Sequence, residues 1–523
     1  MTVELVDVRR DAYADSVQLM TATRSMLERE GVEWAAALMG TPANLEVLAA
    51  EGFADAGPGE ATASDVVIAV RAQSDGQARQ ALEAAGTALA GTALAGLASA
   101  DARQKAEPRS LEDAVRLLPD ANTALISVAG PYAAIEAHKA LSHGLHTLLF
   151  SDNVSVADEI DLKRRARDLG LLLMGPGAGT SFLGGTGLGF SNAVRSGPVG
   201  VVAGAGTGAQ EIMTLVHRWG SGISSVIGIG GRDLHDQVGG LMGDLALSAL
   251  LDDEETKVIV LVAKPPSPKV AGSLLTRLGA KPAVVSFVGL PENSPAPGGV
   301  RLAGSMEEAA AAAVSLAGLA PPAVGHGLSA AAEAAAAKLD PRQTAVRGLF
   351  SGGTLCSESM VLVSKRLGPV YSNVPLRPEW ARPGPPGAHR CLDLGEEEFT
   401  RGRPHPMIDV AARVEHIERE AADPATAVIL LDVVLGYGSH PDPASVLGPA
   451  CEQARRGGRG RRGRRGPSVV TYVLGTEEDP QGRRQQEQML ADAGCVLAPT
   501  GARAALLAAA IAARRPEIAE EAP

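Results

Sequence analysis

The sequence predicts a large α/β protein with parallel sheets, divided into three domains. Short β-branched runs alternate with longer Ala- and Leu-rich stretches along almost the whole chain, which is typical of strands and helices that alternate around a parallel sheet. The chain has 523 residues, too many for a single hydrophobic core. Aromatic residues make up only 3% of it, so aliphatic side chains must fill the cores, as in parallel strands covered by Ala-rich helices.

The first predicted domain spans residues 1–195. Its apolar runs are short, and stretches of helix length lie between most of them. Strands are expected at 3–8, 33–39, 65–70, 123–128, 146–150 and 170–174. Since strands that alternate with helices are joined by crossover connections, we expect a parallel sheet with helices on both faces.

The strand–helix pattern then starts again twice. A second domain is predicted over 196–320, where a strand at 199–206 enters a Gly-rich turn. A third, over 335–515, opens with a similar strand and turn at Ala345. Further strands are expected at 223–231, 258–263 and 283–289, and at 428–438, 469–475 and 495–499.

A basic segment interrupts the third domain, with seven arginines in RRGGRGRRGRRG from Arg455 onward. Glycine between arginines leaves no apolar face, so we expect a disordered surface loop over 455–467; weak contact with a nucleic acid or another anionic partner is the alternative. The whole chain has a net charge of −12, which argues against a specific nucleic-acid binder.

The sequence gives no sign of secretion or of a membrane. The four cysteines form no CxxC pair, so neither a disulfide framework nor a zinc site is predicted, and a reducing compartment fits best. The N-terminus lacks the apolar segment of a signal peptide, and acidic residues interrupt the apolar stretch at 245–262. We therefore expect a soluble, cytoplasmic protein.

One turn occurs twice and carries the main functional signal. Gly204–Glu211 and Ser351–Glu358 each follow an apolar strand, open a helix, and place Gly before a Thr and Glu four residues after it. Free N–H groups and the helix dipole attract an anion to such a helix start. Either turn alone is better explained by a tight strand-to-helix connection, but the matched pair favours a shared phosphate site. Its predicted ligands are Gly206, Thr207, Gly208, Gly352, Gly353 and Thr354.

Neither turn contains the Lys of a P-loop or a complete dinucleotide fingerprint, so nucleotide binding at these turns is not predicted. His405, Lys264 and Arg232 are the candidate catalytic residues, and Asp233, Arg403 and Asp409 the candidate substrate-binding residues. Two prolines fix the backbone of His405, and Asp409 is placed to orient its imidazole. For each candidate, an ordinary loop or surface role is the alternative. No histidine has the partner pattern of a metal ligand.

Several motifs resemble known proteins. GPVGVVAGAGTGAQE with VIGIGGRDL (226–234) resembles the first ligase domain of the succinyl-CoA synthetase α subunit, and LDLGEEEFTRG with VILLDVVLGYG resembles the C-terminal domain of the β subunit. Together with MGTPAN (39–44), SDNVS (151–155), GGTL (352–355) and GRPHPMID (402–409), they resemble the FdrA family, often labelled acyl-CoA synthetase, over nearly the whole chain. Members of that family are also implicated in oxamate carbamoyltransferase complexes.

The resemblance implies a Rossmann-like CoA-binding-type domain followed by two flavodoxin-like ligase domains that supply both phosphate-binding helices. It implies an enzyme subunit that handles an acyl or carbamoyl group through a phosphate intermediate. Further protein subunits, a small-molecule substrate, CoA as a candidate cofactor, and ATP only through a partner subunit belong to the same expectation. The alternatives are carbamoyl transfer without CoA and a non-catalytic scaffold or sensor. This chain departs from the α subunit after the strand at 283–289, where the phosphorylated His is replaced by Gly289–Pro295 with no His.

Overall fold

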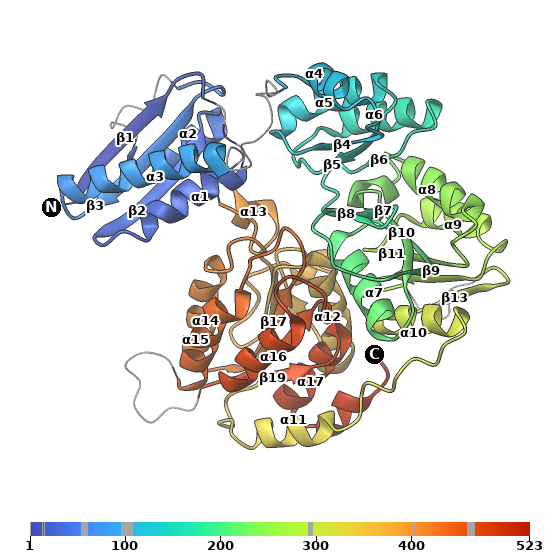
Figure 1. Ribbon diagram of the computed structural model, residues 1–523. Helices are drawn as coiled ribbons and strands as arrows, with labels where there is room; N and C mark the ends of the chain where they lie inside the picture. The colour runs from blue at the N-terminus through green and yellow to red at the C-terminus, as the bar shows by residue number, and fades with distance from the viewer. Residues whose placement is uncertain are drawn as a thin grey trace. The chain divides into compact units, whose positions relative to one another are not determined.

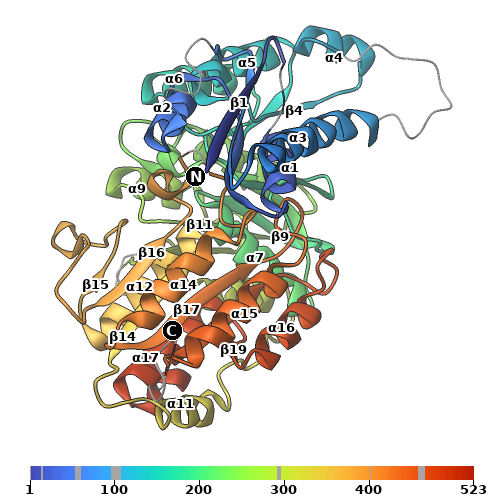
Figure 2. The same ribbon diagram turned by 90° about the vertical axis from the view of Figure 1, so that its left-hand side faces the viewer.

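The computed structural model describes residues 2–12, 14, 16–53, 61–95, 108–290, 296–401, 403–457 and 466–523 (Figures 1 and 2). Most of the predicted basic loop, 458–465, lies outside the described residues. The chain forms two compact units. One comprises residues 1–107 with 400–404, and the other comprises 108–399 with 405–523. The expected single domain over 1–195 is therefore wrong, because the chain divides at residue 107.

The N-terminal unit contains an antiparallel sheet with strand order β1-β3-β2, formed by Val3–Arg9, Val66–Ala72 and Val32–Met39. Helices α1 (Ser16–Leu27) and α3 (Asp75–Ala95) pack on one face, and α2 (Pro42–Ala50) packs on the other. The expectation of a parallel sheet is wrong for these strands. β1 and β2 run in the same direction, as a strand–helix–strand unit requires, but β3 lies between them and is antiparallel to both.

The larger unit begins with a small parallel sheet, β4-β5-β6. Its strands are Thr123–Ile126, His146–Leu149 and Leu173–Met174, and the helices α4, α5 and α6 span Leu111–Leu117, Gly130–Ser142 and Val156–Asp168. Only this part of the predicted first domain has the parallel arrangement that was expected.

A seven-stranded sheet follows, with order β13-β12-β11-β9-β10-β7-β8. Its strands are β7 (Thr180–Leu183), β8 (Thr186–Gly189), β9 (Ser196–Ala203), β10 (Ile223–Gly228), β11 (Val258–Ala263), β12 (Ala283–Phe287) and β13 (Val300–Leu302). Its helices are α7 (Gly206–Arg218), η3 (Gly231–Leu234), α8 (Leu241–Asp252), α9 (Pro268–Arg277) and α10 (Met306–Leu316). Strands β9 to β13 pair in parallel, while the hairpin β7–β8 is antiparallel.

The last sheet has six parallel strands in the order β15-β16-β14-β17-β18-β19. They are β14 (Ala345–Phe350), β15 (Val370–Tyr371), β16 (His389–Asp393), β17 (Thr426–Val434), β18 (Ser468–Leu474) and β19 (Val496–Ala498). Its helices are α11 (Leu328–Ala336), α12 (Gly353–Leu367), η4 (Pro378–Trp380), α13 (Glu397–Thr400), α14 (Ala412–Ala422), α15 (Pro443–Arg455), α16 (Arg483–Asp492), α17 (Gly501–Ala513) and η5 (Pro516–Glu520). The predicted α/β fold class with parallel sheets is thus confirmed for the larger unit.

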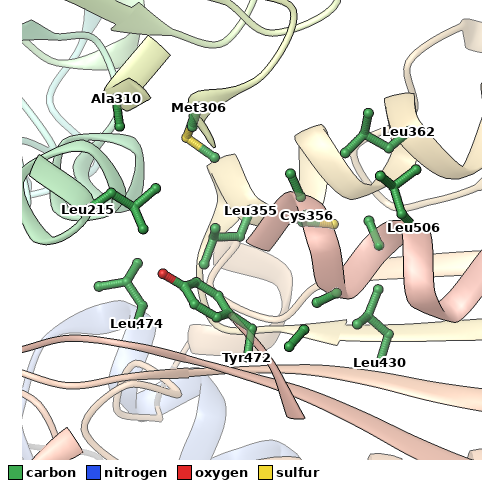
Figure 3. Close-up of a cluster of buried hydrophobic side chains, with 14 of the residues drawn as sticks. Leu215, Met306, Ala310, Leu355, Cys356, Leu362, Leu430, Tyr472, Leu474 and Leu506 are labelled. Carbon is green, nitrogen blue, oxygen red and sulfur yellow. The ribbon is translucent and has the colours of Figure 1, made fainter. Parts of the chain in front are cut away.

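One hydrophobic core joins the seven-stranded and six-stranded sheets. Side chains of α7 and α10 meet those of α12, α17 and the last sheet, among them Leu215, Met306, Leu355, Tyr472 and Leu506 (Figure 3). Because α17 is buried along almost its whole length, the two sheets share an interior. Among the described residues, no helix is long and apolar enough to cross a membrane.

The two matched glutamates of the repeated turn bind reciprocally across this core. Glu211 of α7 accepts hydrogen bonds from Tyr472 Oη (2.6 Å) and from the backbone N of Gly501 (3.2 Å), where α17 starts. Glu358 of α12 accepts one from the backbone N of Met306 (2.6 Å), where α10 starts. Each of the two repeated helices therefore caps a helix that belongs to the other sheet.

Candidate functional site

The two repeated helices begin side by side. The backbone N of Thr354 donates a hydrogen bond to Thr207 Oγ1 (3.3 Å). Neither position has room for a larger residue. If residue 208 carried a Cβ, it would lie 3.0 Å from Thr354 Cγ2, and a Cβ on residue 352 would lie 2.8 Å from Thr207 Cγ2. The helix starts can approach this closely because glycine stands at these positions. The structure thus brings the predicted phosphate ligands Gly206–Gly208 and Gly352–Thr354 together.

The helix starts present N–H groups without acceptors. In the described part of the chain, the backbone N–H groups of Gly206, Thr207 and Gly208 on α7, and of Gly353 and Leu355 on α12, make no hydrogen bond. The aligned peptide dipoles place partial positive charge at both helix starts. Unpaired donors at two adjoining helix N-termini suit an anion with several oxygens, such as a phosphoryl group.

The turn before α12 is fixed by a buried carboxylate that the sequence reasoning missed. Asp432 accepts hydrogen bonds from the backbone N of Ser351 (2.8 Å) and of Gly352 (2.7 Å). Arg413 donates to Asp432 Oδ1 (2.9 Å) and to the carbonyl oxygen of Leu349 (2.6 Å). These bonds use the backbone N–H groups of the turn, Ser351 and Gly352, and leave the N–H groups of Gly353 and Leu355 at the start of α12 available. The sequence feature that could have revealed Asp432 is a lone aspartate within the apolar run VILLDVV.

Lys264 and Asp393 lie beside the start of α12. Lys264 Nζ lies 3.8 Å from Asp393 Oδ2 and 3.5 Å from Glu396 Oε1. A Cβ at Gly353 would lie 2.4 Å from Asp393 Oδ2 and 3.2 Å from Lys264 Nζ. Burial raises the pKa of Asp393 to about 7, with Lys264 opposing the shift and Glu396 adding to it. Asp393 is therefore able to hold or release a proton near neutral pH, a property that the sequence did not reveal.

His405 and Asp393 both lie beside Gly395. A Cβ at Gly395 would lie 2.6 Å from His405 Nε2 and 3.2 Å from Asp393 Oδ1. Nδ1 accepts the backbone N–H of Met407 (3.2 Å), so Nε2 carries the proton of the neutral ring. Burial, together with the charge of Arg413, lowers the pKa of His405 to about 4. The imidazole is thus a neutral hydrogen-bond donor at neutral pH.

Asp409 does not orient the imidazole of His405, and its predicted contact with a substrate stays a prediction. Its Oδ1 accepts the backbone N–H of Ala411 (3.0 Å) in front of α14. Met407 orients the imidazole of His405 instead, and the ring of Phe190 packs against it with centroids 5.8 Å apart. Proximity in sequence was therefore a poor guide to the partner of this histidine.

The loop after β10 uses its two charged residues internally. Asp233 is completely buried and accepts hydrogen bonds from Lys163 Nζ (2.9 Å) and from two backbone N–H groups at the start of α8. Arg232 pairs with Glu159 (2.8 Å) and donates to the carbonyl oxygen of Val154 (2.8 Å). The predicted contact of Asp233 with a substrate is not supported, because no part of its side chain is exposed. Arg232 stays partly exposed, so its predicted role stays a prediction.

Arg403 belongs to the N-terminal unit, and its side chain is exposed. Its role toward a substrate also remains a prediction. No group of three or more His, Cys, Asp or Glu side chains that could hold a metal ion occurs among the described residues.

Comparison with known proteins adds to this geometry. The family described as "CoA-ligase" matches residues 349–511, which include α12 and the site around Asp393. The uncharacterized protein YahF of Escherichia coli (strain K12) is 39% identical over 518 residues, which cover 97% of this chain and 98% of YahF. The chain belongs to the family of YahF.

More distant relatives match over part of the chain. Subunit alpha 2 of the succinate–CoA ligase (ADP-forming) of Archaeoglobus fulgidus is 33% identical over 159 residues, which are 30% of this chain and 54% of that subunit. Over this part of the chain, the sequence is similar to alpha subunits of succinate–CoA ligases. A solved ATP citrate lyase from Methanothrix soehngenii overlaps 40% of this chain and 36% of its own, with 19% identity and a TM-score of 0.31, too low to add to the argument.

Residues 1–107 match the family described as "AllF, heavy metal-associated domain". The residues present do not fit a heavy-metal site, because this segment contains neither cysteine nor histidine. Soft metal ions require thiolate, thioether or imidazole ligands, and of these only methionines occur in the segment. The match therefore describes the fold of the N-terminal unit and not a metal site.

Proposed function

We propose that this chain is an acyl-CoA synthetase-like enzyme subunit that transfers an acyl or carbamoyl group through a phosphate intermediate. In this proposal the phosphoryl group lies at the starts of α7 and α12. The unpaired N–H groups of Gly206, Thr207, Gly208, Gly353 and Leu355 carry the argument. Such preorganised donors stabilise negative charge that develops on phosphoryl oxygens.

The side chains around the helix starts suit this chemistry. Lys264 supplies a positive charge next to Gly353 and neutralises part of the anion. Asp393 exchanges the proton that moves between the nucleophile and the departing phosphate, since its pKa of about 7 lies close to neutrality. His405 offers its Nε2–H as a donor to the carbonyl oxygen of the group in transfer. Arg232 remains a proposed contact for the rest of the substrate.

A specific observation favours carbamoyl transfer without CoA as a second candidate. The segment Gly289–Pro295 contains no histidine to carry a phosphoryl group, which the succinyl-CoA synthetase resemblance would lead one to expect there. The strands of residues 1–107 form an antiparallel sheet, so they do not complete a Rossmann-type CoA-binding domain. In either case we propose that any use of ATP depends on another subunit, as the resemblance to the FdrA family implies.

The thermal stability of the purified chain, with CoA, inorganic phosphate or carbamoyl phosphate added in turn, tests the proposal. A ligand at a hundred times its Kd adds about 2.7 kcal/mol of stability. Stabilisation by phosphate supports the anion site. Further stabilisation by CoA supports acyl-CoA chemistry, and stabilisation by carbamoyl phosphate without any effect of CoA supports the second candidate.

A matched pair of glycine variants ties the effect to the site. Gly353→Ala places a Cβ 2.4 Å from Asp393 Oδ2 and should abolish stabilisation by phosphate. Gly272→Ala in α9, where a Cβ meets nothing within 4 Å, should leave it unchanged. If none of the three ligands stabilises the wild-type chain, a scaffold or sensor role becomes the better interpretation.

A further inference from the structure

One buried hydroxyl near the start of α7 has no hydrogen-bond partner. Thr180, the first residue of β7, is 1% exposed, and its Oγ1 makes no hydrogen bond to any described residue. An unpaired buried hydroxyl costs roughly 1–3 kcal/mol. Such a group in a well-packed region calls for an explanation.

The hydroxyl of Thr180 points at the phosphate-binding helix. A Cβ at Gly206 would lie 3.3 Å from Thr180 Oγ1 and 3.8 Å from the backbone N of Thr180. Gly206 opens α7, and its own N–H group is among the unpaired donors described above. The unpaired hydroxyl of Thr180 therefore lies next to the unpaired N–H group of Gly206.

The neighbouring residue shows that the local fold can satisfy a hydroxyl. Ser181 Oγ accepts the backbone N–H of Gly228 (3.0 Å), which ties β7 to β10. Main-chain pairing holds Thr180 in place, because β7 pairs with β8 at Thr180 and Gly189. The backbone of Gly228 also lies against the carbonyl oxygen of Thr180, so closely that a side chain at position 228 would overlap it. The backbone of Thr180 is thus fixed, and its hydroxyl is held in position at the start of α7.

We propose that the hydroxyl of Thr180 is a further ligand of the phosphoryl group at α7, donating its proton to a phosphoryl oxygen next to Gly206. This inference rests on the proposed function and places the anion on the side of the α7 start that faces β7. A hydroxyl that donates to a charged oxygen forms one of the stronger hydrogen bonds in proteins. The missing partner of Thr180 is then the ligand itself.

The test combines binding and stability for three threonine variants of the full chain, with inorganic phosphate as the probe in calorimetric titration. Thr180→Val removes the hydroxyl with little change of shape and should weaken phosphate binding by about ten- to a hundredfold, the effect of losing one hydrogen bond to a charged group. Thr180→Ser keeps the hydroxyl and should retain most of the affinity.

Thr471→Val is the matched control. Thr471 Oγ1 is also buried and unpaired, on β18, and alternation with Val469 and Val473 places it on the face opposite to Tyr472, which contacts α7. Both valine variants should melt at a higher temperature than the wild type without ligand, because each removes an unpaired buried hydroxyl. Only Thr180→Val should lose affinity for phosphate.

Three results would overturn the inference. Equal phosphate affinity for Thr180→Val and the wild type would show that Thr180 does not touch the anion while leaving the proposed function intact. A lower melting temperature of unliganded Thr180→Val would show that the hydroxyl is satisfied within the protein. A wild-type chain that binds no phosphate would refute both the proposed function and this inference.

Discussion

The capping of α10 by Glu358 leads to a quantitative prediction about pH. Glu358 is almost fully buried and accepts a hydrogen bond from the backbone N of Met306 (2.6 Å). Burial raises its pKa from the usual 4.5 to about 8, with the nearby Glu211 and Glu307 adding to the shift. At neutral pH the folded protein therefore holds a proton on Glu358 that the unfolded chain releases.

The sign and size of the effect follow from this difference. Between its unfolded pKa of 4.5 and its folded pKa of about 8, Glu358 binds more protons in the folded state, so the free energy of unfolding falls as pH rises. Each pH unit costs about 1.36 kcal/mol, which amounts to a loss of roughly 3 kcal/mol by pH 7. The stabilising contribution is fully present below pH 4.5 and is lost as pH rises to about 8.

Glu358→Gln removes the titrating group and keeps an oxygen for the Met306 N–H. We expect the free energy of unfolding of the variant to exceed that of the wild type between pH 5.5 and 8, by a margin that grows by about 1 kcal/mol per pH unit. Urea unfolding at several pH values, followed by circular dichroism, measures this difference. Glu307→Gln is the contrast within the same acidic cluster, because it breaks the pair with Arg503 (2.7 Å) and should destabilise at every pH. If the free energies of unfolding of the wild type and of Glu358→Gln differ by the same amount at every pH, the reasoning is refuted.

Two further predictions concern charges at and near the site. Lys163→Met should lower stability by about 3–5 kcal/mol in thermal melts, because it leaves the buried carboxylates of Glu159 and Asp233 without their shared cation; a loss below 1 kcal/mol would contradict this. Asp393→Asn should bind sulfate, whose charge does not change with pH, more tightly at pH 8.5 than the wild type, because Asp393 is ionised above a pKa of about 7 and repels the anion. The two should bind alike at pH 6, and equal affinities at both pH values would count against a position of Asp393 at the anion site.

The sequence revealed the parts of the fold that local pattern controls. The apolar runs that open at 199 and 345, each ending in a Gly–Thr turn, became β9 with α7 and β14 with α12. Alternation of strands and helices could not show that β3 would insert between β1 and β2, because that depends on pairing between distant segments. The N-terminal sheet was misjudged for this reason.

The site residues divide in the same way into those that local sequence pattern reveals and those that only the fold reveals. The glycines and threonines of the two turns were found because they repeat at fixed spacing, and Lys264 because it follows an apolar strand. Thr180 and Asp393 were missed because single polar residues at strand ends look like solvated loop residues in sequence. Asp432 was missed although it lies inside an apolar run, because only the fold shows that it faces the turn before α12. Asp233 was misassigned for the converse reason, since only the fold shows that Lys163 and the start of α8 satisfy its carboxylate.

A crystal structure of the wild-type chain grown with tungstate, an anomalously scattering analogue of phosphate, tests the central claim most directly. The account predicts one anion within hydrogen-bond distance of the backbone N of Gly206 and of Gly353 and of the hydroxyl of Thr180. An empty space between the starts of α7 and α12, with anions bound only at other places, would contradict it.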